Sequence, residues 1–364
     1  MGRKGAIAIA LVVVAVGLIL GAALIQQMPK VPPNENGVTT IANSSEPPSK
    51  QVINVASPRS AFPFMQHWVS QYNNNENAAG SVELGYYAYK PDKPSDLLVV
   101  GELTQVENSS RIIPVSAQSV AVVYNIPSFP DIPSGMKLNA SLLLDIFNGT
   151  VTKWNDQAIK SLNQDLNLPD ERIIVVHENG NSSSLSLLDK YLSTDIKWPR
   201  KSVGVLGPDE LASTVRKTPY SIGYVDFSYA TQTRMTFASI GNSHGSFVLP
   251  STESIKQVLN SSMQVHNVTS ITGSADLRPP FLNESMLGNN SYPITGLYYV
   301  SIPDDIGNDT KNATLDFVKW MIDKDGGQQA LSEVQYPQIY QDNQLLTRYS
   351  GTAINSTFAR ASKS

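Results

Sequence analysis

The sequence predicts an α/β fold with a mainly parallel sheet, preceded by one apolar N-terminal helix and a linker. From residue 52 onward, short apolar runs alternate with longer segments of helical periodicity, a pattern typical of α/β layers. The length of 364 residues suits two domains, taking roughly 150 residues per domain. Residues 6–25 contain no charged side chain, which sets them apart from the rest of the chain.

The individual elements follow from the spacing of apolar residues. Apolar runs bounded by turn-forming residues predict strands at residues 52–56, 82–87, 97–100, 121–124, 173–176, 222–225 and 298–302. Helical spacing predicts helices at residues 65–72, 139–147, 184–192, 251–259 and 315–322. A hairpin is expected between Gly241 and Gly245.

The N-terminal segment is predicted to anchor the chain in a membrane. At about 1.5 Å per residue, a helix over residues 6–25 spans the roughly 30 Å hydrocarbon layer. Basic residues precede this helix, so residues 1–5 are predicted to be a cytoplasmic stub and the bulk of the chain to lie outside. Two alternatives stay open, a cleaved signal peptide and a pilin-type leader cut after Gly5. Residues 26–50 are rich in Pro, Asn and Ser without an apolar period, which predicts a flexible linker.

Asn-x-Ser/Thr triplets, the acceptor pattern for N-glycosylation, also favour an extracytoplasmic location. The candidate positions are Asn43, Asn108, Asn139, Asn148, Asn181, Asn260, Asn267, Asn283, Asn289, Asn308, Asn312 and Asn355. The sequence therefore predicts a single-pass glycoprotein of the cell membrane, with its C-terminal part exposed outside the cell.

Composition argues against several classes of function. Lys and Arg number 27 against 31 Asp and Glu, a net charge of −4, so no nucleic-acid partner is expected. The absence of cysteine removes disulfide frameworks, thiolate metal sites, cysteine nucleophiles and a lipidated cysteine anchor. The four histidines stand far apart without a metal-binding pattern, so no metal or other cofactor is expected. Residues 241–245 (GNSHG) fit the G-x-S-x-G pattern of hydrolases, but a strand-like segment follows instead of a helix, and no enzyme is predicted.

A candidate anion site lies at the strand-to-helix junction after residue 176. Ligands of α/β sheets sit at the carboxyl ends of strands, where helix N-termini present N–H groups. Here a Gly/Asn turn leads to Ser182, Ser183 and Ser184 at the start of the next helix. Two interpretations stay open, a well-capped helix without further role and an anion cradle built from hydroxyls and backbone amides.

Five strings of the sequence resemble motifs of one protein family and stand in the same order. They are residues 60–63 (SAFP), 123–127 (VYNIP), 144–159 (LDIFNGTVTKWNDQAI), 218–225 (TPYSIGYV) and 292–296 (YPITG). The chain thus resembles the substrate-binding proteins of phosphate ABC transporters, the PstS family, over nearly all of residues 52–345. This resemblance implies a two-lobed periplasmic-binding-protein type II fold. One lobe would comprise residues 51–123 plus 247–364 and the other residues 124–246, with the ligand in the cleft between them.

The resemblance places the family's main ligand loop on residues 177–185, with one change of charge. The family's Ser-Gly-Thr falls on Ser182, Ser183 and Ser184, so hydroxyl groups remain available there. The arginine of the family falls on Glu178, which reverses the sign of that side chain. At 4 Å, such a reversal is worth on the order of 8 kcal/mol with an effective dielectric constant near 20.

The other ligand positions implied by the resemblance are also altered. The Thr-Phe pair of the family falls on Ala61 and Phe62, so one hydroxyl is lost and Phe62 is expected to bind through its backbone. The family's aspartate best matches Glu102. Arg59, close to this first loop, is a candidate replacement for the lost positive charge, whereas a solvated loop arginine is the alternative.

The function implied is that of a membrane-anchored, extracytoplasmic solute-binding protein. It would capture phosphate or another small oxyanion between its lobes and deliver it to an ABC permease. The alternative is a degenerate family member, a cell-surface glycoprotein with a structural or interaction role and another surface protein as partner. The reversed charge at Glu178 favours the alternative.

Overall fold

The computed structural model describes residues 50–75, 80, 82–103, 111–127, 135–265, 280–303, 306–341 and 343–361. The described residues all belong to the unit Ser49–Ser364. The predicted stub, membrane helix and nearly all of the linker therefore lie outside the described residues. Within the described ranges, no helix has both the length and the apolar character that crossing a bilayer requires.

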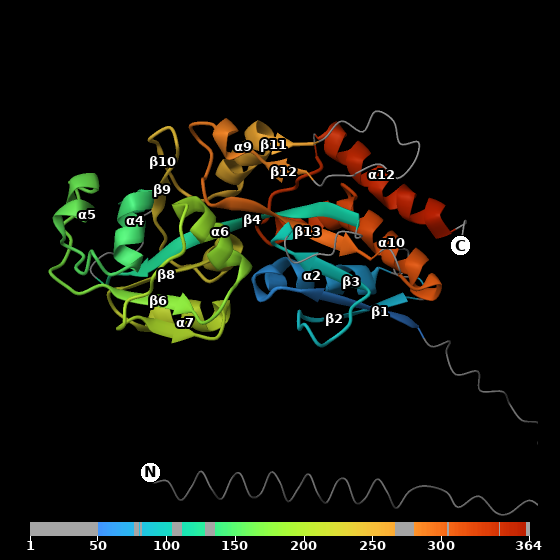
Figure 1. Cartoon of the computed structure of the whole chain (residues 1–364), viewed down its shortest axis with the longest axis horizontal. Coiled ribbons are helices and arrows are strands. Elements are labelled where there is room, and N and C mark those ends of the chain that lie inside the picture. The colour runs from blue at the N-terminus through green and yellow to red at the C-terminus, as the bar shows by residue number, and fades with distance from the viewer. Residues whose placement is uncertain are drawn as a thin grey trace, which may run out of the picture. The chain divides into compact units, whose positions relative to one another are not determined.

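One large sheet organises the described part of the chain (Figure 1). Its strands run in the order β2-β1-β3-β13-β4-β8-β6-β7. Their bounds are β1 (Gln51–Ser57), β2 (Val82–Ala88), β3 (Leu97–Val100), β4 (Arg111–Asn125), β6 (Ile174–Glu178), β7 (Val203–Val205), β8 (Ser221–Asp226) and β13 (Thr295–Ile302). Two small sheets accompany it and comprise β5 (Lys137–Leu138) with β9 (Ser239–Gly241) and β10 (Phe247–Val248), and β11 (Met263–Gln264) with β12 (Phe281–Leu282).

The expectation of a mainly parallel sheet is met only toward the two edges. The outer strands pair in parallel, namely β2 with β1, β1 with β3, β8 with β6 and β6 with β7. The three central pairs, β3-β13, β13-β4 and β4-β8, are antiparallel. An apolar run indicates that a strand is buried on both faces and does not encode its direction, so the mixed pairing was not accessible from the sequence pattern.

Strand β4 belongs to both halves of the sheet. It pairs with β13 over residues 111–119 and with β8 over residues 120–125. The apolar pattern predicts only residues 121–124 of this strand. The chain therefore passes from one half of the fold to the other within a single continuous strand.

The first half of β4 escapes the sequence pattern because of a proline and several polar residues. Pro114 has no N–H to donate, and the register of β13 shifts between Tyr298 and Tyr299 at this point. Ser116 and Gln118 are fully buried although polar, which breaks the apolar run. The strand forms because its neighbours on both sides bury it.

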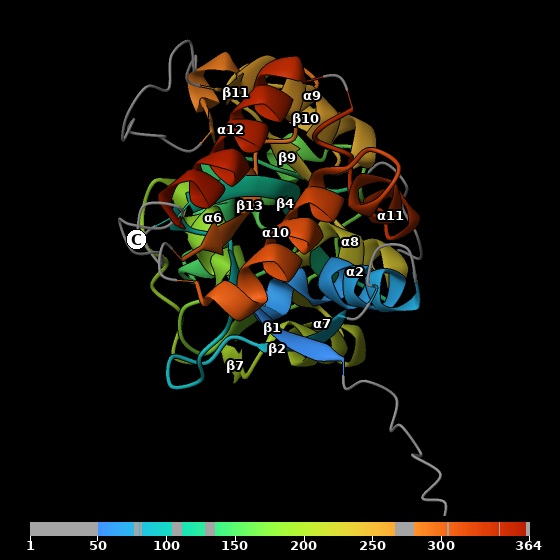
Figure 2. The ribbon, with the colours of Figure 1, turned by 90° about the vertical axis from the view of Figure 1, so that its right-hand side faces the viewer.

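Helices and two separate hydrophobic cores complete the two lobes. The first core, around β1, β3 and β13, packs α2 (Phe62–Asn74), α10 (Asn308–Ile322), α11 (Gly327–Glu333) and α12 (Gln344–Ala361). Figure 2 shows α10 and α12 side by side in this lobe. The second core, around β4, β6 and β8, packs α4 (Ala140–Phe147), α5 (Gln157–Leu162), α6 (Ser183–Leu192), α7 (Pro208–Lys217), α8 (Phe227–Gln232) and α9 (Thr252–Ser262).

Candidate functional site

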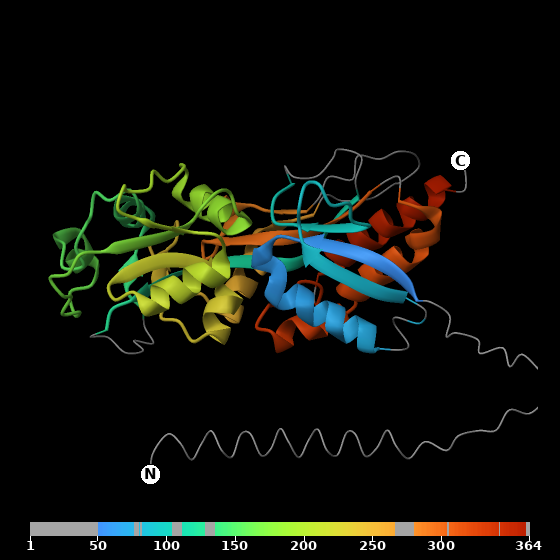
Figure 3. The same cartoon turned by 90° about the horizontal axis from the view of Figure 1, so that it is seen from below.

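The turn that precedes α2 meets the first residues of α6 where the two lobes touch (Figure 3). A short 3₁₀ turn, η1 (Arg59–Ala61), leads into α2, and the carboxyl end of β6 leads into α6. A cavity of about 350 Å³ lies between these loops. It is lined by Pro58, Arg59, Ser60, Tyr89, Leu98, Val99, Glu178, Asn179, Asn181, Ser182, Ser183, Leu206, Gly207 and Pro208.

The loop from the second lobe brings the N-terminus of α6 to the wall of the cavity. Gly180 adopts a positive φ of 88°, which turns the chain after β6. Ser182 then caps α6, because its Oγ accepts the Leu185 N–H at 3.1 Å. The N–H groups of the first turn lack partners within the helix and carry the positive end of its dipole. Ser183 lines the cavity, whereas Ser184 is buried and does not.

The loop from the first lobe presents side chains but not the backbone amides expected from the sequence. The Ala61 N–H donates to Pro58 O at 3.0 Å, and the Phe62 N–H donates to Arg59 O. Ala61 is fully buried, and the Phe62 ring packs on Tyr86 with their centroids 5.3 Å apart. In this arrangement Ala61 and Phe62 support the loop, while its other residues line the cavity.

Ser60 also lines the cavity, although the alignment of motifs did not identify it as a ligand residue. Its Oγ shares a hydrogen bond of 2.6 Å with Ser183 Oγ across the lobes. The motif alignment draws attention to the missing hydroxyl at Ala61, but Ser60, the residue before it in the 3₁₀ turn, lines the cavity. The sequence did contain a clue, because Ser60 is a hydroxyl residue directly before Ala61.

The two lobes also touch at Gly101, directly after β3. A Cβ atom added there would lie 2.6 Å from Ser183 Cβ and 2.9 Å from Gln118 Oε1. Such distances are shorter than any side chain tolerates, so only glycine permits this approach. Gly101, Ser60 and Ser183 therefore form the direct contact between the lobes at this site.

The cavity contains both a positive and a negative side chain. Glu178 is buried, with 7% of its surface exposed. Burial raises the pKa of its carboxyl group, while the hydrogen bond from Ser182 and the charge of Arg59 act in the opposite direction. Arg59 is exposed and lies against Gly207, since a Cβ atom there would be 3.1 Å from Arg59 Nη1. Among the described residues lining this cavity, these two carry the charges.

Glu102 lies in a different cavity. This second cavity, of about 410 Å³, is lined by residues that include Gly101, Glu102, Gln118, Ser183 and Lys190. Ser183 lines both cavities, so they meet at the start of α6. Lys93 lies away from either cavity, with its Nζ 3.5 Å from the centroid of the Tyr87 ring.

The candidate glycosylation positions divide by their environment. The side chains of Asn43, Asn108, Asn267 and Asn308 lie outside the part of the chain whose side chains the structure describes. Exposed side chains are those of Asn181, Asn260, Asn289, Asn312 and Asn355. Three others are half-buried and accept a backbone N–H through their side-chain oxygen, namely Asn139, Asn148 and Asn283. Asn181 is the candidate at the mouth of the interlobe cavity.

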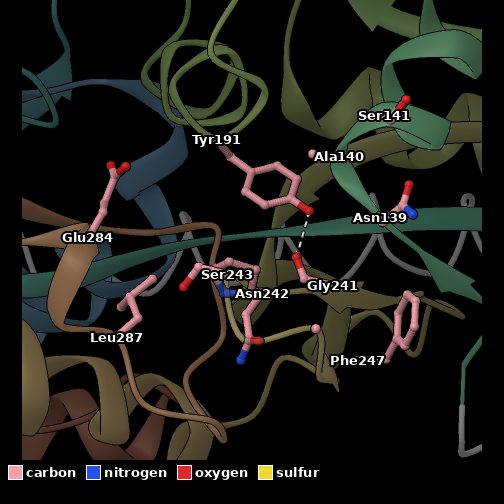
Figure 4. Close-up of a pocket in the computed structure, with 12 residues that line it drawn as sticks. Asn139, Ala140, Ser141, Tyr191, Gly241, Asn242, Ser243, Phe247, Glu284 and Leu287 are labelled. Carbon is pink, nitrogen blue, oxygen red and sulfur yellow. Dashed lines mark hydrogen bonds between the residues drawn. The ribbon is translucent and has the colours of Figure 1, made fainter.

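The G-x-S-x-G segment forms a hairpin turn beside another cavity (Figure 4). β9 pairs antiparallel with β10, so Ser243 lies in the turn between two strands and not before a helix. The Tyr191 hydroxyl points toward this turn and donates to Gly241 O at 2.8 Å. The arrangement is not that of a nucleophile elbow.

The side chain of His177, at the start of the ligand loop, contacts other side chains of the protein. The ring of His177 stacks on Trp198, with centroids 4.4 Å apart, and its Nε2 contacts Ser202 Oγ at 3.1 Å. Within the described residues, no three His, Cys, Asp or Glu side chains gather as a metal site would require.

Comparison with known proteins agrees with this architecture. A family model described as the PBP superfamily domain matches residues 98–325. The phosphate-binding protein PstS of Xylella fastidiosa (strain Temecula1) is 30% identical, over 84% of this chain and 88% of that protein. PstS of Methanocaldococcus jannaschii is 26% identical, over 84% and 87% of the two chains.

A solved structure extends the likeness to three dimensions. The crystal structure of a phosphate ABC transporter substrate-binding protein from Clostridium perfringens superposes with a TM-score of 0.55 at 12% identity. The match covers 79% of this chain and 99% of that one, which shows the shared two-lobed fold. The chain belongs to the PBP superfamily and, within it, to the family of PstS phosphate-binding proteins.

Proposed function

We propose that this protein is an extracytoplasmic solute-binding protein that captures phosphate or another small oxyanion and delivers it to an ABC permease. The observation that carries the proposal is the convergence of Arg59, Ser182 and Ser183 on one interlobe cavity at the N-terminus of α6. A helix N-terminus and hydroxyl donors stabilise an anion, and a guanidinium group can hold an oxyanion through two hydrogen bonds. The similarity to phosphate-binding proteins supports the same assignment.

The balance of charges decides how such a site would work. A micromolar Kd corresponds to about 8 kcal/mol of binding free energy. An ionised Glu178 at 4 Å from an anion would oppose binding by about 4 kcal/mol at an effective dielectric constant near 20. Arg59 at a similar distance offsets this repulsion. In this proposal, Arg59 takes over the role of the family's arginine.

The same proposal includes the arrangement of the whole chain. Residues 6–25 would anchor the protein in the cell membrane, with residues 1–5 in the cytoplasm and residues 26–50 as the tether. Residues 51–123 plus 247–364 would form one lobe and residues 124–246 the other, although α9 packs against the second of the two hydrophobic cores. Glycans on exposed asparagines would cover the outer surface.

One observation favours the alternative of a cell-surface module without an oxyanion ligand. The hydroxyls of Ser60 and Ser183 bond to each other directly, so one of the two protons that could face a ligand is already donated within the protein. In that case the lobes would serve as a rigid glycosylated scaffold for a protein partner.

Calorimetric titration of the full chain with phosphate, sulfate and a neutral sugar tests the proposal. We expect phosphate or sulfate to bind with a micromolar or lower Kd. Arg59→Ala should weaken that binding by about tenfold to a hundredfold, because it removes a charged hydrogen-bond donor. Lys93→Ala, which removes a cation outside the cavity, is the matched control and should bind like the unmodified protein. Lack of binding by both oxyanions would refute the proposal and favour the alternative.

A further inference from the structure

The interlobe cavity contains two opposite charges that do not neutralise each other directly. Arg59 acts on the pKa of the Glu178 carboxyl group through its charge, and the ion pairs of the described residues do not join these two side chains. Arg59 instead extends along Gly207 at the mouth of the cavity. The cavity therefore offers a cationic and an anionic position to one ligand.

An inorganic anion makes full use of only the cationic position of this cavity, at Arg59. Phosphate and sulfate can contact Arg59 and the N-terminus of α6. Sulfate has no proton to share with a carboxylate at neutral pH, and phosphate can use it only as the acceptor of one P–OH hydrogen bond. A ligand that also carries an ammonium group would convert that unfavourable neighbour into a partner. Glu178 is nine-tenths buried, so a cation beside it would be screened little by solvent.

The size and the lining of the cavity fit a ligand larger than a tetrahedral anion. Its volume of about 350 Å³ is at the small end of the range for ligand pockets, roughly 300–1,000 Å³. A tetrahedral anion takes the space of only a few water molecules of about 30 Å³ each. Leu98, Val99 and Leu206 add apolar surface, which suits a short methylene spacer between two charged ends.

We propose that the interlobe cavity binds a small zwitterion, an aminoalkylphosphonate, whose phosphonate group lies at Arg59, Ser182 and Ser183 and whose ammonium group pairs with Glu178. This inference rests on the proposed function, since it assumes that the cavity binds an oxyanion. It assigns to Glu178 the recognition of the second charge.

Titration of the full chain with three probes tests the inference. The probes are inorganic phosphate, ethylphosphonate and 2-aminoethylphosphonate, and the last two differ by the amino group. We expect 2-aminoethylphosphonate to bind at least about tenfold more tightly than ethylphosphonate. Glu178→Gln should abolish this difference, because it removes the negative charge while preserving the size of the side chain. Glu83→Gln, the same change at an exposed position of β2, should preserve it.

The outcomes separate this inference from the proposed function. Equal affinities for the two phosphonates, with phosphate still bound, would overturn the zwitterion and leave the proposed function intact. Failure of all three probes would overturn both. The Glu178→Gln variant is first checked for correct folding by circular dichroism. If it still prefers 2-aminoethylphosphonate over ethylphosphonate by the same factor, Glu178 does not recognise the ammonium group.

Discussion

At the scale of single residues, Asp226 is the most unusual group of the described chain outside the cavity. It is 2% exposed and ends β8 at the point where that strand pairs with Val120. Burial raises the pKa of its carboxyl group to about 7, although the Tyr336 hydroxyl donates to it at 2.7 Å. One carboxyl oxygen caps α8 through the Ser228 N–H, and the other has no partner among the described residues.

We expect Asp226 to make the stability of the protein depend on pH. Its pKa rises from 3.8 when unfolded to about 7 when folded, so between these values the folded chain holds more protons. The free energy of unfolding therefore falls as pH rises from about 4 to 7, by up to about 1.4 kcal/mol per pH unit. Below this window both states are protonated, and above it both are ionised.

Asp226→Asn should flatten this part of the pH profile, because asparagine can cap α8 without ionising. Differential scanning calorimetry between pH 4 and 8 measures the difference in Tm between the variant and the unmodified protein. Asp156→Asn changes another aspartate that caps a helix, α5, and should leave the slope in place. Parallel Tm profiles for Asp226→Asn and the unmodified chain would contradict the assignment.

At the scale of elements, the N-terminus of α6 has two separable roles. Ser182 stabilises the helix through its cap and also lines the interlobe cavity together with Glu178. Ser182→Ala should lower the free energy of unfolding by about 1 kcal/mol, the usual cost of a lost cap, and should weaken oxyanion binding as well. Urea unfolding and calorimetric titration measure the two effects.

Ser251→Ala is the matched control for this change. Ser251 caps α9 by accepting the Ser254 N–H at 3.0 Å, and it does not line the interlobe cavity. Its loss should destabilise the fold by a similar amount without changing affinity. If Ser182→Ala destabilises the protein but binds oxyanions normally, the helix start has only a structural role.

The sequence predicted elements where a dense apolar run coincides with a cap, but regular apolar spacing alone was not enough, since α7 is strongly amphipathic and was not predicted. The strand over residues 174–178 and the helix that follows it combine a dense apolar run with a serine cap, and both were predictable. The first half of β4 was not, because Pro114 and buried polar residues obscure it. Helix α12 has weak apolar periodicity and was not predicted either.

The candidate site was predictable for those polar residues that are close together in the sequence. Glu178, Ser182 and Ser183 follow one strand, so their proximity could be inferred, and the structure places them in one cavity with Arg59. The contribution of Ser60 depends on a 3₁₀ turn that motif matching does not reveal. Glu102 follows β3 as expected, but it faces the second cavity.

At the scale of the whole molecule, the contact at Gly101 controls how closely the lobes approach. Gly101→Ala would place a Cβ 2.6 Å from that of Ser183, so the lobes should separate or tilt. Small-angle X-ray scattering should show a larger radius of gyration, and oxyanion affinity should fall by about tenfold or more. Gly288→Ala, where the nearest atom would be 3.6 Å away, is the control and should change neither. An unchanged radius and affinity in Gly101→Ala would show that the contact yields without cost.

The continuity of β4 has a mechanical consequence. Because the partner of this strand changes from β13 to β8 between Ser119 and Val120, the peptide link between them is the natural pivot for any opening of the lobes. Because β4 is a strand of both halves of the sheet, unfolding of one half would also remove a hydrogen-bonded strand from the other. The proposed lobes are joined a second time after residue 246, so bending would involve both connections, and Asp226 pairs with Val120 at the first of them.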